Sequence, residues 1–76
     1  MTELYTIIGR VLGIPSEQIT DTTSPDTVAG WDSYNGLMLV SEIEQEFHVS
    51  FTMDEVVAVR NVGDVKAALH RHGISV

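Results

Sequence analysis

Residues 30–47 read GWDSYNGLMLVSEIEQEF, and this stretch decides which fold the chain can form. Its apolar residues at helical spacing are Leu39, Val40, Ile43 and Phe47. Such a stripe predicts an amphipathic helix over about residues 33–47, with one face against a core. Asp32 lies directly before it, where a carboxylate can accept hydrogen bonds from the free backbone N–H groups of the first turn. The stretch therefore predicts a long helix that begins at Ser33, after a capping aspartate.

An earlier helix is predicted by a second apolar pattern. Its residues follow the spacing i, i+3, i+4, i+7 and i+8, and they are Leu4, Ile7, Ile8, Val11 and Leu12. Thr2 is a candidate cap at its start and Gly13 a candidate end. The long segment that follows is rich in Ser, Thr, Asp and Pro, which favour turns. Because it also contains the spaced apolar residues Ile19, Val28 and Trp31, we expect an ordered loop held against the core.

Two shorter helices are predicted in the last third of the chain. Thr52 and Glu55 have the spacing of a capping box, which favours a short helix over the strand that the following valines would allow. Asn61 is a candidate cap for the last helix, and Gly73 is a candidate end. The predicted fold class is therefore all-α, a small four-helix bundle with a long loop between the first and second helices and a short third helix. We expect residues 1–76 to form one domain.

Charge narrows the range of partners. The chain has 76 residues and a formal net charge of -7. Between Val11 and Val59 there is no Lys or Arg, so a nucleic acid is a poor partner. The acidic surface suits a protein with a basic patch, or it serves only to keep a small protein soluble.

Composition argues against a metal site, a membrane segment and an enzyme. The chain has no cysteine, so neither a disulfide nor a thiolate zinc site is possible, which fits a reducing cytoplasm. His48, His70 and His72 do not form a set on one helix face, and we predict no metal site. No apolar run approaches the roughly 18 residues of a membrane span. So small a chain also offers little scaffold for a preorganised catalytic site.

Ser33 is the candidate functional residue, because it stands where the long loop meets the long helix. A serine at a helix start is most often only a cap. The same position favours a negatively charged group, since unpaired N–H groups and the helix dipole point toward it. A phosphodiester attached to Ser33 would lie in that favourable field.

Large apolar side chains near Ser33 lie off the core stripe of the same helix. At about 100° per residue, Tyr34, Leu37 and Met38 point away from the core. Ser41 shares their side of the helix. Two interpretations stay open at this point: these residues form a contact surface for a partner, or the long loop covers them.

Taken together, these features resemble those of the acyl carrier protein family. The resemblance covers nearly the whole chain and includes Asp32-Ser33 at the start of the second helix and the stretch from Leu39 to Phe47. In that family the serine after the aspartate receives phosphopantetheine from coenzyme A. The resemblance therefore implies that Ser33 is the attachment residue and that Asp32 belongs to the motif read by the transferase. The implied partners are a phosphopantetheinyl transferase, a ligase that loads an acyl or aminoacyl group, and downstream synthase or transferase enzymes.

On this interpretation the protein is a monomeric, cytoplasmic carrier and not an enzyme. It would hold acyl or aminoacyl groups as thioesters and present them to partners through a surface that comprises Tyr34, Leu37, Met38, Ser41 and Glu44. The family usually has Leu at the position of Tyr34, and its fatty-acid members have an acidic residue at Met38 and a Met at Ser41. These differences point to a specialised pathway, such as polyketide, amino-acid or surface-polysaccharide synthesis. An unmodified acidic helical module that binds a basic partner is the alternative hypothesis.

Overall fold

The computed structural model describes residues 3–76. Within that range every regular element is a helix. The elements are α1 (Glu3–Leu12), the 3₁₀ turn η1 (Ser16–Gln18), α2 (Ser33–Phe47), α3 (Met53–Ala58) and α4 (Val62–Arg71). The predicted all-α bundle with a long first connection and a short third helix is therefore confirmed. The turn η1 inside that connection was not predicted. The expected cap at Thr2 lies outside the described residues.

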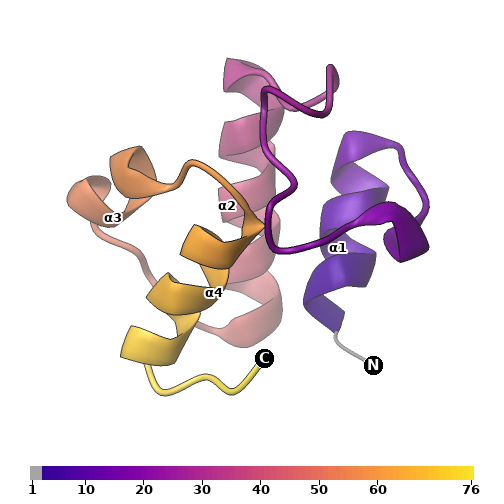
Figure 1. Ribbon diagram of the computed structural model, residues 1–76. Helices are drawn as coiled ribbons and strands as arrows, with labels where there is room; N and C mark the ends of the chain where they lie inside the picture. The colour runs from indigo at the N-terminus through magenta and orange to yellow at the C-terminus, as the bar shows by residue number, and fades with distance from the viewer. Residues whose placement is uncertain (1–2) are drawn as a thin grey trace.

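The four helices surround a small core (Figure 1). α1 and α2 lie side by side and run in opposite directions, and α4 runs downward in front of α2 in this view. The long loop crosses the front of the bundle before it rises to the start of α2. α3 lies at the left edge, and the start of α1 and the C-terminal residue lie at the bottom. No helix among the described residues is long and apolar enough to cross a membrane.

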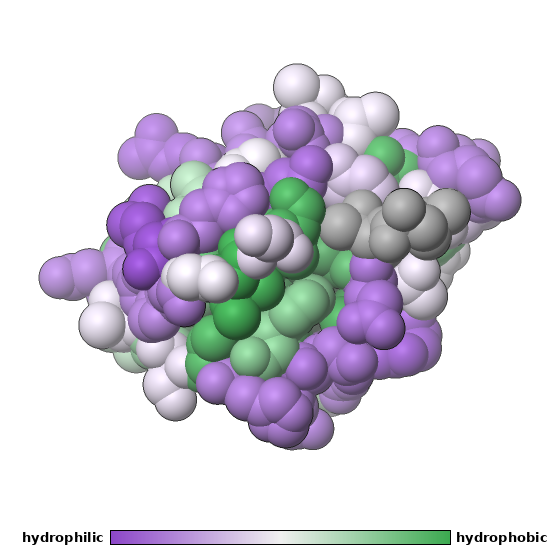
Figure 2. Space-filling view, turned by 90° about the horizontal axis from the view of Figure 1, so that it is seen from below, coloured by the Kyte–Doolittle hydropathy of each residue, from purple (hydrophilic) through white to green (hydrophobic). Residues whose placement is uncertain are grey.

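The core is built from the predicted apolar stripes. Its most completely buried large side chains are Leu4, Ile8, Leu39, Ile43, Val62 and Leu69. Val40 and Phe47, which the α2 stripe also includes, are only half-buried. On the lower face of the molecule, a strip of hydrophobic surface is bordered by hydrophilic residues (Figure 2). A small domain leaves part of its apolar surface exposed, as expected for a chain of this length.

The long loop is ordered because it is tied to the core and to α4. Ile19 and Trp31 are buried as predicted. The loop also contains a buried threonine that the sequence reading missed, Thr23, whose carbonyl accepts the backbone N–H of Val62 at 3.0 Å. The carbonyl of Asp21 accepts the N–H of Gly63 at 2.8 Å. These bonds fasten the loop to the first turn of α4, whose free N–H groups they satisfy.

A polar cluster of three side chains joins α1, the long loop and α4. The Lys66 ammonium donates to the Asp21 carboxylate at 2.9 Å and to the Tyr5 hydroxyl at 2.8 Å, and that hydroxyl donates to Asp21 at 2.7 Å. The hydrogen bond from Lys66 and then that from Tyr5 lower the pKa of Asp21. The hydrogen bonds to Tyr5 and then Asp21 raise the pKa of Lys66. The cluster therefore favours the ionised pair and holds the loop between α1 and α4.

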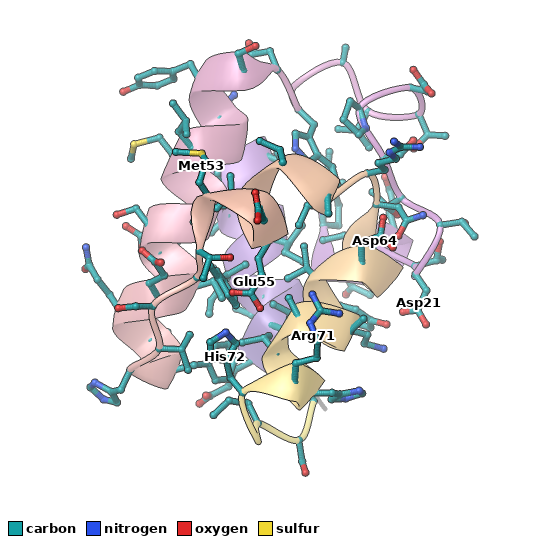
Figure 3. All side chains as sticks on the ribbon, turned by 90° about the vertical axis from the view of Figure 1, so that its left-hand side faces the viewer. Asp21, Met53, Glu55, Asp64, Arg71 and His72 are labelled. Atoms are coloured by element: carbon teal, nitrogen blue, oxygen red, sulfur yellow. The ribbon has the colours of Figure 1, made fainter. Side chains whose placement is uncertain are left out.

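α3 is attached by polar contacts at its start rather than by buried side chains. The predicted capping box is present, with Thr52 Oγ1 accepting from Glu55 N and Glu55 Oε1 accepting from Thr52 N. Among the described residues of α3, none is buried. Glu55 also reaches the end of α4, where its oxygens lie 3.1 Å from His72 Nε2 and 3.7 Å from Arg71 Nε (Figure 3). The capping bond from the Thr52 N–H, and then the contact with His72, lower the pKa of Glu55.

Candidate functional site

The start of α2 leaves the hydroxyl of Ser33 free. Asp32 is the cap, as predicted, and its carboxylate accepts the backbone N–H of Asn35 at 2.9 Å. Ser33 is the first residue of the helix and is exposed. Within residues 3–76 no hydrogen bond engages its side chain. Because Asp32 does the capping, the simplest structural explanation for a serine at this position does not apply.

The junction that presents Ser33 is firmly held. The side-chain amide of Asn35 donates to the carbonyl of Gly30 at 2.6 Å. A Cβ atom on Gly30 would lie 2.9 Å from the carbonyl oxygen of Leu12, so any larger residue there would force the loop away from α1. Trp31, which follows Gly30, is buried and anchors the loop in the core. The position of Ser33 is therefore set by the neighbours of the loop and not by the loop alone.

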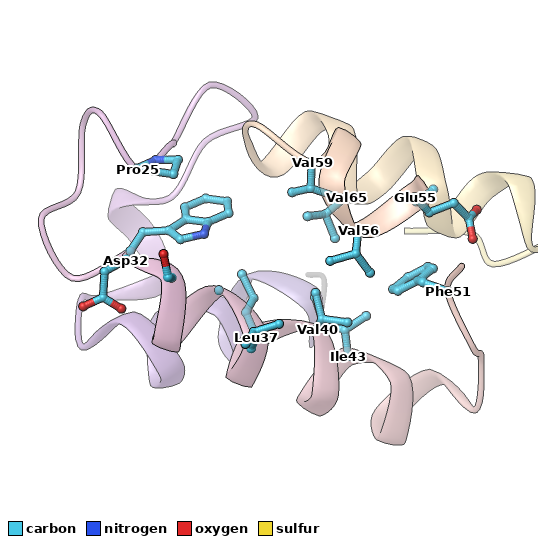
Figure 4. Close-up of a pocket in the computed structure, with 15 residues that line it drawn as sticks. Pro25, Asp32, Leu37, Val40, Ile43, Phe51, Glu55, Val56, Val59 and Val65 are labelled. Carbon is cyan, nitrogen blue, oxygen red and sulfur yellow. The ribbon is translucent and has the colours of Figure 1, made fainter. Parts of the chain in front are cut away.

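A cavity of about 540 Å³ opens beside Ser33, between α2 on one side and α3 and α4 on the other (Figure 4). Asp32 lies at one end, whereas Phe51 and Glu55 lie at the other. The remaining lining is almost entirely apolar and consists of Pro25, Trp31, Gly36, Leu37, Leu39, Val40, Ile43, Val56, Val59, Val65 and Ala68, together with Ser33. Its volume lies in the range of small-molecule sites. The sequence reading did not identify the cavity, because its walls come from the long loop, α2, α3 and α4, which only the fold brings together.

The apolar residues beside Ser33 are exposed, so the long loop does not cover them. The exposed fractions are 70% for Tyr34, 65% for Leu37 and 39% for Met38. Met53 and Val57 on α3 are also exposed, at 73% and 69%. The sequence reading missed these two, although an aliphatic residue directly after a capping threonine could have signalled an outward side chain. Of the two open interpretations, the structure favours a contact surface.

Two carboxylates that flank this surface are engaged within the chain. Glu44, which was expected on the partner surface, is half-buried, and its carboxylate accepts the backbone N–H of Phe51 at 2.7 Å. Glu42 pairs with Arg10 of α1 at 3.1 Å. Ser41 is exposed as expected and accepts a weak bond from Gln45 at 3.4 Å. The exposed side of α2 next to Ser33 therefore offers Tyr, Leu, Met, Ser and Gln side chains, none of which is charged.

No metal set is formed within residues 3–76, where no group of three His, Cys, Asp or Glu side chains converges. The histidines contact different groups. His72 contacts Glu55, and the ring of His70 lies 3.4 Å from the carbonyl oxygen of Val76. His48 ends α2 in the left-handed conformation, with φ 57°. What the site offers is a free hydroxyl at a helix start, an apolar cavity and an exposed apolar surface.

Comparisons with known proteins agree with this geometry. A family model described as "Phosphopantetheine attachment site" matches residues 2–69. Among solved structures, one from Mycobacterium tuberculosis described as "a putative acyl carrier protein" is similar to this chain with a TM-score of 0.81. That similarity covers 92% of this chain and 93% of the other, at 24% sequence identity, and it shows a shared fold.

Proposed function

Because the chain belongs to the family of phosphopantetheine-bearing carrier domains, within which acyl carrier proteins have this fold, we propose that Ser33 carries its phosphopantetheine arm. The observation that carries the proposal is the free, exposed hydroxyl of Ser33 at the first position of a 15-residue helix. Such a helix start stabilises a phosphate through its N–H groups and dipole. Asp32 stays engaged as the cap, so modification of Ser33 costs the helix no capping bond.

Attachment requires only an accessible serine and a transferase. Ser33 Oγ would form a bond to the phosphorus of the arm as the bond between that phosphorus and the adenosine bisphosphate part of coenzyme A breaks. The hydroxyl proton would leave to a base of the transferase. The chain itself supplies no catalytic group to this step. Its contribution is to hold Ser33 outward at a junction fixed by Asn35 and Gly30.

The cavity beside Ser33 favours acyl over aminoacyl cargo. Its walls are aliphatic and aromatic, and its volume is in the range that holds a small ligand. Burial of an apolar chain there is favourable, whereas burial of an ammonium group without a partner would be costly. Of the two carboxylates in the lining, Asp32 caps α2 and Glu55 is bound by Thr52 and His72. We therefore infer that the arm carries acyl thioesters with an apolar portion.

Partner enzymes would carry out all the chemistry on the cargo. We propose a phosphopantetheinyl transferase, an acyl-loading ligase and downstream synthases or transferases, docking on the exposed surface around Tyr34, Leu37 and Met38. The absence of an acidic residue at Met38, together with Ser41 in place of a methionine, supports a specialised pathway in the cytoplasm rather than primary fatty-acid synthesis. We take residues 1–76 as one carrier domain, since the family match runs over residues 2–69. Tethering would raise the effective concentration of the cargo at each partner.

Intact mass tests the attachment residue. The purified chain is incubated with coenzyme A and a broad-specificity phosphopantetheinyl transferase. The wild-type chain should gain the mass of one phosphopantetheinyl group, and Ser33→Ala should gain none. Ser50→Ala, which changes an exposed serine beyond the end of α2, is the matched control and should be modified like the wild type. Modification of Ser33→Ala, or of no form in the presence of an active transferase, would refute the assignment.

A further inference from the structure

The cavity wall contains one polar group that the carrier assignment leaves unused, the indole N–H of Trp31. Trp31 is 7% exposed and lines the cavity together with Gly36. A Cβ atom built on Gly36 would lie 3.5 Å from the indole nitrogen and 3.8 Å from Cδ1. The N–H edge of the ring therefore faces the one position of this helix turn that has no side chain, and nothing at residue 36 covers it.

The indole N–H of Trp31 has no acceptor among the described residues. Within residues 3–76 no hydrogen bond involves the indole nitrogen, although a buried tryptophan normally has a partner for it. In the same part of the chain no side-chain nitrogen or oxygen is both sealed from solvent and unpaired. The indole N–H must therefore retain access to solvent. Because the residue is otherwise buried and lines the cavity, that access is through the cavity.

The other polar side chains of the cavity cannot replace it. Of the described lining residues, only Ser33 and Trp31 have side chains that donate when the carboxylates are ionised. Ser33 loses its hydroxyl proton when the arm is attached. Glu55 and Asp32 are acceptors and are already engaged. In the loaded protein, Trp31 is thus the one remaining side-chain donor among these lining residues.

We propose that the indole N–H of Trp31 donates a hydrogen bond to a carbonyl oxygen of the group that the arm brings into the cavity. This rests on the proposed attachment at Ser33 and names the chemistry that the cavity selects: an apolar group that carries a carbonyl. The carbonyl has three possible sources, which are an amide of the arm, the thioester, and an oxo group on the acyl chain. A plain alkyl chain would displace water from the N–H and leave it unpaired, so the cavity discriminates against it.

The chain has one tryptophan, so its indole N–H gives a single, assignable signal in a ¹H–¹⁵N spectrum. Four forms are compared: the unmodified chain, the chain with the arm alone, and chains loaded from hexanoyl- and 3-oxohexanoyl-coenzyme A. Intact mass verifies each form. When the acceptor arrives, the signal should move downfield and its exchange with solvent should slow about three- to tenfold, as one ordinary hydrogen bond predicts. If the indole signal changes with the arm alone, the acceptor is an amide of the arm. If it first changes in the hexanoyl form, the acceptor is the thioester carbonyl. If it first changes in the 3-oxohexanoyl form, the acceptor is the oxo group of the acyl chain.

The same indole signal in four forms of verified mass would overturn the proposal and leave the attachment at Ser33 intact. Failure to load Ser33 would instead refute the attachment. Gly36→Ala is the matched variant, because its added Cβ makes an ordinary contact with the indole nitrogen and partly covers it without a clash. The downfield shift should be smaller in this variant. An undiminished shift would mean that the acceptor does not approach across residue 36.

Discussion

Two truncations on α2 should distinguish side chains that stabilise the fold from side chains that bind partners. Ile43 is 1% exposed, whereas Leu37, less than two turns earlier, is 65% exposed beside Ser33. Ile43→Ala removes fully buried methyl groups and should cost about 2–5 kcal/mol. Complete burial of a leucine is worth about 1.5–3 kcal/mol, so the third of Leu37 that is covered accounts for roughly 0.5–1 kcal/mol. The two truncations should thus differ several-fold in their effect on stability.

These free energies convert into a measurable difference in melting temperature. At about 2.1 cal/mol/K per residue, the unfolding entropy of 76 residues is roughly 160 cal/mol/K, so 1 kcal/mol shifts the midpoint by about 6 °C. Ile43→Ala should therefore melt about 12–30 °C below the wild type, and Leu37→Ala about 3–6 °C below it. Far-UV circular dichroism on the unmodified chains measures both. Glu46→Ala, an exposed position on the same helix, controls for the change in helix propensity.

Reaction rates should show the opposite order of effects from stability. Leu37→Ala should reduce the rate of modification or of acyl transfer at least about fivefold, which corresponds to 1 kcal/mol at a partner contact. Ile43→Ala, assayed below its midpoint, should be affected less. If Leu37→Ala melts as early as Ile43→Ala, the exposed face of α2 belongs to the core. If instead it is stable and reacts at the wild-type rate, that face is not a docking surface.

Two further predictions concern acidic side chains that the fold uses internally. Glu44→Lys removes the charged acceptor of the Phe51 N–H, a hydrogen bond worth about 1.5–3 kcal/mol. The melting midpoint should therefore fall by roughly 9–18 °C. An unchanged midpoint would mean that Glu44 acts only on the surface. The pKa of Glu55 is held below its ordinary value of 4.5 by Thr52 and His72, so its contribution to stability is complete above pH 4.5 and is lost as pH falls through the lowered value. The difference in midpoint between the wild type and Glu55→Gln should therefore shrink below pH 4.5, and a constant difference from pH 7 to pH 3 would contradict this.

Local signals in the sequence were sufficient to predict the helices. The apolar stripes repeat every three or four residues, and the caps at Asp32, Thr52 and Asn61 act on N–H groups only three residues away. All three caps form as predicted. Such features are determined by neighbours along the chain, which is why a single sequence reveals them. The positive φ of His48 is a different case, because glycine or asparagine is the usual residue at such a helix end, and nothing in the sequence marks a histidine for it.

Contacts between distant segments explain what the sequence could not reveal. Tyr5, Asp21 and Lys66 have no visible relation until the loop lies between α1 and α4. The same holds for the cavity, whose wall combines residues from the loop, α2, α3 and α4. At the site, the sequence predicted a functional serine after a capping aspartate, but not that Glu44 turns inward to Phe51. That contact joins residues seven positions apart across a helix end, where no periodic pattern applies.

Because several carboxylates are bound within the chain, net charge and contact chemistry should contribute differently to docking. A chain with a net charge of -7 and no cation between residues 11 and 59 first indicates recognition by basic patches. Yet Glu42, Glu44 and Glu55 are each bound within the chain, and the exposed side of α2 beside Ser33 is uncharged. Long-range attraction depends on net charge, which internal pairing of single carboxylates changes little, whereas contact energy depends on the groups at the interface. We therefore expect salt to affect how fast partners associate, and the apolar residues around Leu37 to determine how long they stay bound.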